Sequence, residues 1–542
     1  MKIKSHISLI LPYSFTICII LLLLPINGYC LATNTMSSTL DVPTSESPLH
    51  ITLDYKKTNG IIKAYSEIQE GPIPNPLIRN HVDLTKQFQQ IGISYIEPHN
   101  LATGISTMFP DWDADPTLES SYDFTVCDKY VTSIINAGCR VLFTLHENAL
   151  IDISLRTLPK NMSKWAEVCK HIVMHYNDGW NNGYYYNITY WEFLSEPDKI
   201  LLETPENYYQ LYNITARTLK AYNSSLKIGG PCTFTVTFTN KRYTEDFLNY
   251  IVENNLPFDF FSWHHFPYTP NQLYSESQAV LFLLNKYGLT DCENILTSWN
   301  PWISRFQRDH ENAKNAAFTA CSLTTFQDAG IDYAFRFRGS PEREPHRLFR
   351  FLGLDASLFS RKGMFKKPAL AYLAMRYVTR DTPIRLTTPI MDVSYGITYL
   401  AGNSEDDTNV SILISNYNFE DTKYNLELTN LPWNTSYTAV HYLIDDKHHL
   451  EVVEKNTLSE SSYIISKTLK SNTVQLIRLT NSSHIPDEGP PTARIPIILR
   501  LKILDPLSRA LNRLIFFIMF SNNPYANVLH KIIMRFYDRL IN

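Results

Sequence analysis

The sequence lacks several features that would assign a function directly. No two cysteines are spaced as Cys-x-x-Cys, so a metal site of that kind is not expected. No glycine-rich loop follows the first expected strand, which argues against a doubly wound sheet that binds nucleotide phosphates. Basic residues are not in excess, because the formal net charge is −4, whereas nucleic-acid scaffolds usually carry a basic surface. No metal, cofactor or nucleic-acid partner is therefore implied.

What the sequence does contain is enough apolar material for a large core. Of its 542 residues, 44% are hydrophobic and 19% are charged, which is typical of a folded protein. The length favours a barrel-sized domain with one smaller module. Aromatic residues make up 13%, with 33 Tyr and 28 Phe. This excess suits surfaces that stack on sugars, and dense β-rich packing explains it equally well.

The N-terminal part predicts export. Lys2 and Lys4 precede an apolar run over residues 7–25, which indicates a secretory signal within residues 1–32. The run is also long enough to anchor the chain in a membrane if it is not cleaved. Residues 33–50 are rich in Thr, Ser and Pro and are interpreted as a linker. The six cysteines that follow permit disulfides in a secretory lumen, and the N-x-S/T sequons make a glycoprotein compatible with this sequence.

Residues 481–542 form a basic tail. From Arg494 onward eight Lys and Arg stand against two Asp, so this part carries +6 and the remainder −10. Its last stretch has the period of an amphipathic helix, with an apolar face opposite a basic one. The apolar residues are Leu529, Ile532, Ile533, Phe536 and Leu540, and the basic ones are Lys531, Arg535 and Arg539. Contact with a membrane surface and packing against the protein's own barrel or a partner both remain open.

Between the ends, short strands alternate with helical stretches, and this order predicts a (β/α)8 TIM barrel over residues 51–385. The expected strands are Gly60–Tyr65, Ser94–His99, Arg140–Leu145, Tyr190–Leu194, Leu226–Gly230, Phe258–His264, Asn294–Trp299 and Tyr333–Phe337. Helices are expected over Leu84–Ile91 and Glu206–Ala221. Residues 386–480 instead show short alternating strands, which predict a β-sandwich. These strands are Tyr395–Ala401, Asn409–Tyr417, Tyr424–Leu428, Thr438–Leu443 and Thr473–Leu479.

Chemistry in such a barrel lies at the C-terminal ends of the strands. The residues with suitable side chains at the expected ends are His99, His146, Glu147, Glu196, His264, His265, Ser298, Arg336 and Arg338. Pro197 follows Glu196 and cannot continue the strand ladder, so the carboxylate should sit where the strand stops. His264 is suited to bonding a ligand hydroxyl, although each single histidine also fits a structural role.

One segment is specific enough to suggest a family. Residues 191–198 read Trp-Glu-Phe-Leu-Ser-Glu-Pro-Asp, which resembles the Trp-Glu-x-Trp-Asn-Glu-Pro signature of glycoside hydrolase family 39. That family contains β-xylosidases and α-L-iduronidases. Further segments resemble the family in the same order, and the likeness covers roughly residues 60–480. They are residues 208–216, 227–231, 259–264 and 296–300, and 367–369 together with Tyr372.

The resemblance implies a pair of carboxylates, of which one is missing. Retaining enzymes of this kind carry an acid/base Glu after strand four and a nucleophilic Glu at strand seven, about 5–5.5 Å apart. By resemblance, Glu196 occupies the first position and Ser298 the second. A serine hydroxyl is a much weaker nucleophile unless a base activates it. Ser195 and Leu194 also replace the Asn and Trp of the signature, and residues 335–339 depart from the strand-eight pattern.

Three functions are consistent with these residues. The first is a glycosidase, with Glu196 as acid/base and a substitute nucleophile such as Glu97, Glu147 or a group of the substrate. The second is a catalytically silent relative that binds carbohydrate or a glycoconjugate. Under either, the expected substrate-binding residues are His99, Ser195, His264, Trp299, Arg336 and Arg338.

The third function is an enzyme of another class that acts on an anionic substrate. Arg336 and Arg338 alternate along the eighth strand, so both side chains are expected on one face. Paired guanidinium groups recognise carboxylate, sulfate or phosphate. A salt-bridge cluster with Glu342 and Glu344 is the structural alternative for these arginines.

Overall fold

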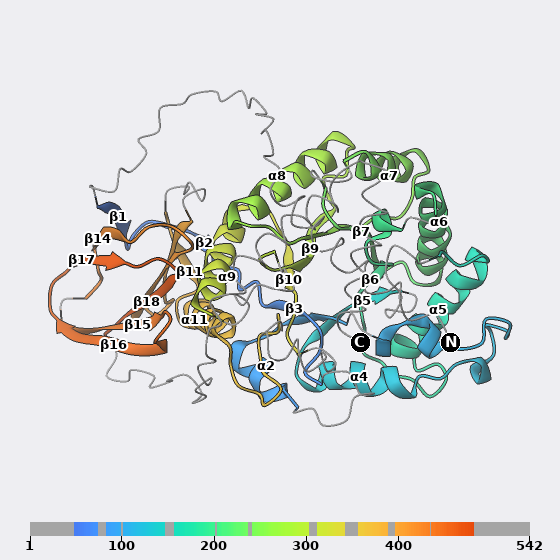
Figure 1. Ribbon diagram of the computed structural model, residues 1–542, viewed down its shortest axis with the longest axis horizontal. Coiled ribbons are helices and arrows are strands. Elements are labelled where there is room, and N and C mark those ends of the chain that lie inside the picture. Colours follow the sequence, from blue (N-terminus) through green and yellow to red (C-terminus); the bar gives the residue numbers. More distant parts are fainter. Residues whose placement is uncertain are drawn as a thin grey trace, which may run out of the picture. The chain divides into compact units, whose positions relative to one another are not determined.

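The computed structural model describes ten stretches of the chain (Figure 1). They are residues 48–73, 83–98, 101–146, 157–200, 203–236, 241–302, 312–341, 356–388, 396–433 and 435–481. The expected signal segment, nearly all of the linker and nearly all of the basic tail lie outside these stretches. Within them, no helix is both long enough and apolar enough to cross a membrane.

Eight parallel strands close into a barrel, which confirms the expected fold. In barrel order they are β3 (Glu67–Gln69), β4 (Tyr95–Glu97), β5 (Arg140–Leu145), β6 (Tyr190–Phe193), β7 (Lys227–Thr233), β8 (Phe260–His265), β9 (Glu293–Trp299) and β10 (Tyr333–Arg336). Strand β10 pairs with β3 and completes the ring. The carboxyl ends of all eight strands therefore meet at one mouth.

Helices surround the barrel (Figure 1). They are α2 (Thr85–Ile91), α3 (Ile105–Met108), α4 (Thr125–Asn136), α5 (Met162–Asp178), α6 (Pro205–Tyr222), α7 (Lys241–Glu253), α8 (Pro270–Lys286), α9 (Ala313–Thr325) and α11 (Lys367–Asp381). Single 3-10 turns are η1 (Leu101–Thr103), η2 (Glu119–Ser121), η4 (Pro197–Lys199) and η6 (Phe326–Asp328). Local signals set several helix ends. The Asn161 side chain caps α5 by accepting from the Lys164 N–H, and Gly179 ends that helix at a φ of 74°.

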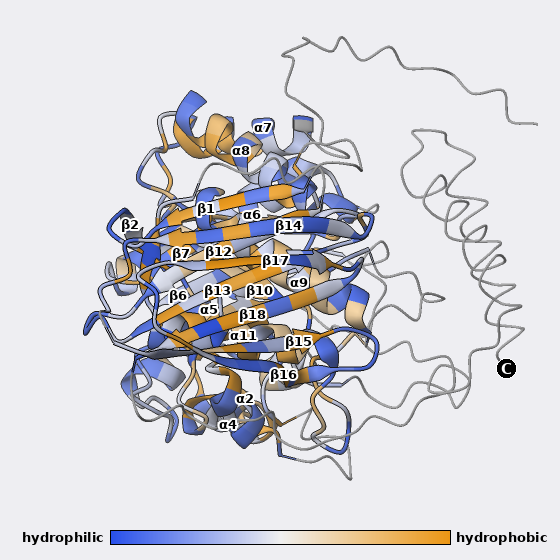
Figure 2. Cartoon of the chain, turned by 90° about the vertical axis from the view of Figure 1, so that its left-hand side faces the viewer, coloured by the Kyte–Doolittle hydropathy of each residue, from blue (hydrophilic) through white to orange (hydrophobic). Residues whose placement is uncertain are grey.

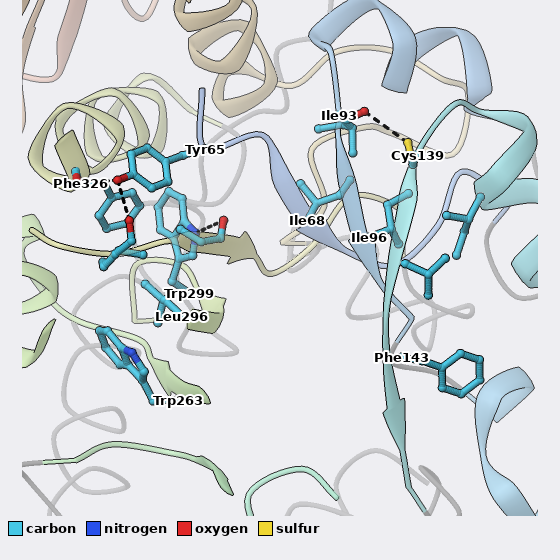
Figure 3. Packing of buried hydrophobic residues seen from close by; sticks show 14 of the residues in the cluster. Tyr65, Ile68, Ile93, Ile96, Cys139, Phe143, Trp263, Leu296, Trp299 and Phe326 are labelled. Atoms are coloured by element: carbon cyan, nitrogen blue, oxygen red, sulfur yellow. Dashed lines mark hydrogen bonds between the residues drawn. The ribbon is translucent and has the colours of Figure 1, made fainter. Parts of the chain in front are cut away.

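The side chains on the two faces of each barrel strand are buried in different surroundings. Outward residues pack against the helices, as Ile68, Ile96, Phe143 and Leu296 do in Figure 3. Inward residues fill the barrel with an apolar plug, formed by Tyr95, Leu142, Tyr190, Phe260, Ile295 and Phe335. Side chains of one face recur with a period of two, and two residues further along β4, β5, β6, β8 and β9 the inward positions are polar. The barrel interior is thus apolar in its middle layer and polar toward the mouth.

A second domain consists of two sheets packed face to face. One sheet has the order β16-β15-β18-β13-β12-β11-β2 and the other β1-β14-β17. Their strands are β1 (Leu49–Asp54), β2 (Thr58–Ile61), β11 (Ile384–Leu386), β12 (Ile397–Asn403), β13 (Asn409–Asn416), β14 (Thr422–Thr429), β15 (Tyr437–Ile444), β16 (His449–Leu458), β17 (Tyr463–Leu469) and β18 (Thr473–Thr480). Hydrophobic and hydrophilic residues alternate along them (Figure 2). The apolar faces enclose a core with Ile51, Ile412, Leu426 and Ile477.

The expected first barrel strand, Gly60–Tyr65, was wrong. Its start belongs to β2, which pairs with β11 of the second domain, and β1 pairs in parallel with β14. Residues that precede the barrel in the sequence and residues that follow it therefore build the second domain together. The true first strand, β3, is three residues long and places the polar Glu67 and Gln69 on its inward face, so no apolar alternation marks it.

The barrel interior is packed tightly enough that one added methyl group should measurably lower the free energy of unfolding. A Cβ at Gly229 would lie 2.3 Å from a ring carbon of Phe260. We expect Gly229→Ala to lower the free energy of unfolding by about 1–3 kcal/mol, because overpacking forces neighbours out of position. Denaturant unfolding measures this loss. In a Phe260→Leu background the same substitution should cost less, and an equal cost in both backgrounds would contradict the assigned contact.

Candidate active site

Glu196 is turned into the barrel mouth by a strained segment after β6. Leu194 and Glu196 adopt φ values of 60° and 51°, a region that side chains other than glycine seldom occupy. The Glu196 N–H donates to the carbonyl oxygen of Cys232 at 2.9 Å, and Pro197 begins η4 directly afterwards. The hydrogen bond to β7 holds Glu196 three residues beyond the end of β6, at the start of η4.

Two basic groups hold the Glu196 carboxylate. Its Oε1 lies 2.9 Å from His264 Nδ1, its Oε2 lies 3.0 Å from Lys199 Nζ, and its side chain is 13% exposed. Burial alone would raise the pKa of Glu196, but the charge of Lys199 and the hydrogen bond from His264 outweigh it and hold the pKa well below its ordinary value. Lys199 is itself steadied over the Phe234 ring. Glu196 is therefore a carboxylate in this state.

His264 links Glu196 to the neighbouring strands. Its Nε2 lies 3.1 Å from the Cys232 sulfur, so both ring nitrogens contact protein groups. His264 also lies in register with Ser298 on β9. The structure thus brings Glu196, His264 and Ser298 to one sector of the mouth. The expected bond from His264 to a ligand hydroxyl would require one of its two present contacts to open.

Ser298 lies at the strand-seven position without an activating base. It is buried, and among the described residues its hydroxyl has one hydrogen-bond partner, Gln69 Oε1 at 3.0 Å. The Gln69 amide donates in turn to Glu97 Oε2 at 2.6 Å. An amide oxygen is not a base that could take the serine proton. The contacts within the described stretches therefore make Ser298 a hydrogen-bond donor and include no base that would generate an alkoxide.

Below the mouth, two buried carboxyl groups share one hydroxyl. Thr144 Oγ1 lies 3.0 Å from both Glu97 Oε1 and Glu192 Oε2. Burial, together with the charge of Glu97, raises the pKa of Glu192 to about 7. The low-dielectric surroundings and the neighbouring negative charge therefore favour the protonated form of Glu192. Glu97, one of the expected substitute nucleophiles, is thus hydrogen-bonded to Gln69 and Thr144.

Trp299 does not face the mouth. Its indole N–H donates to the Ala334 carbonyl at 3.1 Å, and its ring packs on Phe326 in the layer between barrel and helices (Figure 3). Ser195 is buried beside Glu196 in the chain. His99 and Glu147 lie outside the described residues. The structure therefore supplies no substrate contact from Trp299.

The two arginines of strand eight point to different surroundings. Arg336 is fully buried and donates to Asn315 Oδ1 and Thr319 Oγ1 of α9, both at 2.9 Å. Burial lowers the pKa of Arg336 to about 10. Arg338 Nε instead donates to the Ser340 carbonyl at 3.0 Å. The expected shared face is not formed, because β10 ends at Arg336 and the alternation stops there.

Arg338 also lies near an acidic group at the end of β3, since its NH1 is 4.0 Å from Glu70 Oε1. The structural alternative of a cluster with Glu342 and Glu344 falls outside the described residues. Within the described stretches, no group of three or more His, Cys, Asp or Glu residues is arranged to hold a metal ion. All six cysteines from Cys127 to Cys321 are free.

Sequence reasoning missed most of the polar layer under Glu196, although a signal was present. In five of the eight barrel strands, namely β4, β5, β6, β8 and β9, an apolar inward residue is followed two positions later by a polar one. The pairs are Tyr95 and Glu97, Leu142 and Thr144, Tyr190 and Glu192, Phe260 and Ser262, and Ile295 and Thr297. Lys199 and Cys232 carried no comparable signal, because their contacts join separate loops and strands.

Comparisons with known proteins agree with the fold. The sequence model of the family described as Glycosyl hydrolases family 39 matches residues 40–337. A beta-xylosidase of Geobacillus stearothermophilus is 24% identical over 301 residues, and the chain spans 58% of that relative, using 49% of its own length.

Solved structures share the fold over a greater length. A glucosidase from Croceicoccus marinus superposes with a TM-score of 0.69 at 25% identity, over 81% of this chain and 100% of that chain. A monomeric beta-xylosidase from Caulobacter crescentus has a TM-score of 0.63 at 16% identity, over 80% and 99%.

Removing the Lys199 charge should change how stability depends on pH. A carboxyl whose pKa is depressed by folding stabilises the protein above its unfolded pKa of about 4.3, and this stability is lost as pH falls through the folded value. In Lys199→Met the pKa of Glu196 should rise, so the variant should be less stable than wild type above about pH 5 and approach it at lower pH. Unfolding free energies measured from pH 3 to 7 test this. Lys86→Met, at an exposed position on α2, is the control, and a pH-independent difference for Lys199→Met would contradict the account.

Proposed function

Because this chain belongs to glycosyl hydrolases family 39, we propose that it binds a glycoside at the barrel mouth and acts on the O-glycosidic bond, with Glu196 as the acid/base group. The observation that carries the proposal is the Glu196 carboxylate, set at the end of β6 and oriented by His264 from β8. The beta-xylosidase relative makes a β-xyloside the first substrate to test.

An acid/base group must both hold and release a proton, and the contacts of Glu196 suggest how. In the resting state Lys199 and His264 keep it ionised, which suits a base and not an acid. A bound sugar that displaces the Lys199 ammonium would remove the larger charge effect and raise the pKa. Burial would then favour the protonated acid that the leaving oxygen requires.

The covalent step of a retaining glycosidase has no group to perform it at position 298. A glycosyl-enzyme requires a nucleophile that also stabilises positive charge on the sugar ring, and the Ser298 hydroxyl has only the Gln69 amide as partner. We therefore propose that no glycosyl-enzyme forms through this position. Hydrolysis would then need Glu196 to protonate the leaving oxygen and a second carboxylate, such as Glu97 or Glu147, to activate a water molecule on the opposite face of the sugar, and a single displacement of this kind inverts the anomeric configuration.

A second candidate function, glycoside binding without turnover, is favoured by the same serine. Position 298 carries a hydroxyl and not a carboxylate, so recognition can persist where bond cleavage does not. Glycan-array binding measured beside hydrolysis of aryl β-xylosides and aryl β-glucosides separates the two functions. Turnover that disappears in Glu196→Gln supports the first, and binding without turnover supports the second.

We also propose that the protein is exported through the secretory pathway, on the basis of the basic residues and apolar run near its N-terminus. A protein expressed in a eukaryotic secretory host should then carry N-linked glycans on some of its sequons. Its mass should fall after treatment with an amidase that removes such glycans. An unmodified protein retained in the cytosol would contradict this location.

Restoring a carboxylate at position 298 should restore the missing step. We expect Ser298→Glu to raise hydrolysis of an aryl β-glycoside by at least about 10²-fold, the order that one charged catalytic group contributes. The new carboxyl would lie close to Gln69 and near Glu97, so its pKa should be raised and the gain should grow with pH.

Ser298→Gln is the matched control, because it has nearly the same size and cannot ionise. It should show no gain, and Glu196→Gln in the Ser298→Glu background should remove most of the activity on substrates with poor leaving groups. A folded Ser298→Glu protein that is inactive on every aryl glycoside tested would mean that the mouth no longer supports the family's chemistry.

A further inference from the structure

Glu196 contacts one ring nitrogen of His264, Nδ1, and the thiol of Cys232 contacts the other, Nε2. His264 Nδ1 lies 2.9 Å from Glu196 Oε1, and Nε2 lies 3.1 Å from Cys232 Sγ. We propose that Cys232 is a positioning residue: its S–H donates to His264 Nε2 and thereby fixes the neutral tautomer whose Nδ1–H holds the Glu196 carboxylate. The effect of Cys232 on catalysis rests on the proposed acid/base role of Glu196. The assignment of the His264 tautomer does not depend on that role.

The direction of each hydrogen bond follows from what the groups can donate. An ionised carboxylate accepts only, so the proton between Glu196 and His264 belongs to Nδ1. In a neutral imidazole the other nitrogen is then an acceptor, and its partner must be a donor. A protonated thiol meets this requirement, while a thiolate would instead call for a charged imidazolium. The Cys232 sulfur also interacts with Glu192 and lies 3.7 Å from Thr297 Oγ1. In the proposed arrangement its single S–H is directed to Nε2, and the tautomer of His264 then depends on the protonation of Cys232.

The surroundings keep Cys232 as a thiol. It is fully buried, and burial followed by the negative charges of Glu192 and Glu97 raises its pKa well above the ordinary value. From α6, the Tyr208 side chain also lies close enough to interact with Glu192 and Cys232. The Lys199 ammonium binds Oε2 of Glu196, which is not the oxygen that contacts His264. Reactive cysteines are partly exposed and have positive neighbours, so Cys232 is a donor here and not a nucleophile.

The backbone shows that this placement is specific. The β7–β8 register shifts between Pro231 and Thr233, so Cys232 is an extra residue in the ladder and adopts a φ of 55°. Such a bulge redirects a side chain at a local cost. The Cys232 N–H donates to Ser262 Oγ at 3.0 Å, and its carbonyl accepts from the Glu196 N–H at 2.9 Å. Cys232 is therefore tied to Glu196 through the backbone as well as through His264.

Loss of the thiol donor should loosen this arrangement. Without a donor at Nε2, the tautomer that carries its proton on Nε2 becomes competitive, and Nδ1 then faces the carboxylate as a lone pair. The hydrogen bond that favours the charged form of Glu196 is lost, so the pKa of Glu196 should rise. Serine keeps a donor at this position, whereas valine has a similar shape and none.

The tautomer can be observed directly by NMR of protein labelled with 15N-histidine, since protonated and unprotonated ring nitrogens differ in chemical shift. The His264 signals are assigned by their loss in His264→Gln. Wild type and Cys232→Ser should show the Nδ1–H tautomer, and Cys232→Val should lose it in favour of the Nε2–H form. Cys169→Val, at another fully buried cysteine on α5, should leave the His264 signals unchanged.

Three results would overturn the proposal. One is an Nε2–H tautomer in the wild type, and another is a Cys232→Val spectrum that matches that of Cys169→Val. The third is rapid alkylation of Cys232 by iodoacetamide in the native protein, which would indicate an accessible thiolate.

A second readout connects the tautomer to function. If an aryl β-xyloside is bound or hydrolysed, the acidic limb of its pH profile should move up by about one unit in Cys232→Val. Cys232→Ser should restore the wild-type profile, and Cys169→Val should not alter it. An unmoved limb in Cys232→Val would contradict the positioning role. A wild type that binds no glycoside but shows the Nδ1–H tautomer would refute the proposed function and leave this inference standing.

Discussion

The hydrogen bond between Glu196 and His264 is the contact on which the arrangement of the mouth depends. It joins the strained segment after β6 to the end of β8, and it gives a buried carboxylate one of its two stabilising partners. Through the same imidazole the contact reaches Cys232 on β7, and through strand register it reaches Ser298 on β9. A change at any of these positions therefore alters the environment of Glu196.

Beneath this contact, the barrel replaces its usual apolar filling by a polar layer. Glu97, Thr144 and Glu192 lie above an aromatic plug, and the carboxyl pair is buried with one shared hydroxyl. Such a layer costs free energy unless its groups are hydrogen-bonded and part of its charge is neutralised by protons. The raised pKa of Glu192 is one expression of that cost. The Ser298 hydroxyl belongs to the same network through Gln69, which is why it donates a hydrogen bond to an amide and faces no base.

The sequence alone predicts the features that local patterns determine, and it does not predict those that depend on contacts between residues distant in the chain. Strand β5, Arg140–Leu145, was predicted to the residue because an apolar run is bounded by clear breaks. Strand β3 was missed because its inward residues are polar. The position of Glu196 followed from a motif and a proline, but the outward orientation of Trp299 and Arg336 did not, since a motif identifies residues and not the face they occupy. Contacts such as Cys232 with His264 depend on a bulge and on register, which no local pattern reveals.

The central claim, that the mouth holds a glycoside without forming a glycosyl-enzyme, can be tested by trapping. A 2-deoxy-2-fluoro-β-xylosyl fluoride slows both steps of a double displacement and leaves the sugar attached to a competent nucleophile. The intact mass of the wild-type protein should remain unchanged after prolonged incubation, while folded Ser298→Glu protein should gain one fluoroxylosyl group at position 298. A wild-type protein that gains the same mass, with the sugar mapped to a side chain in the mouth such as Glu97 or Ser298, would contradict the account.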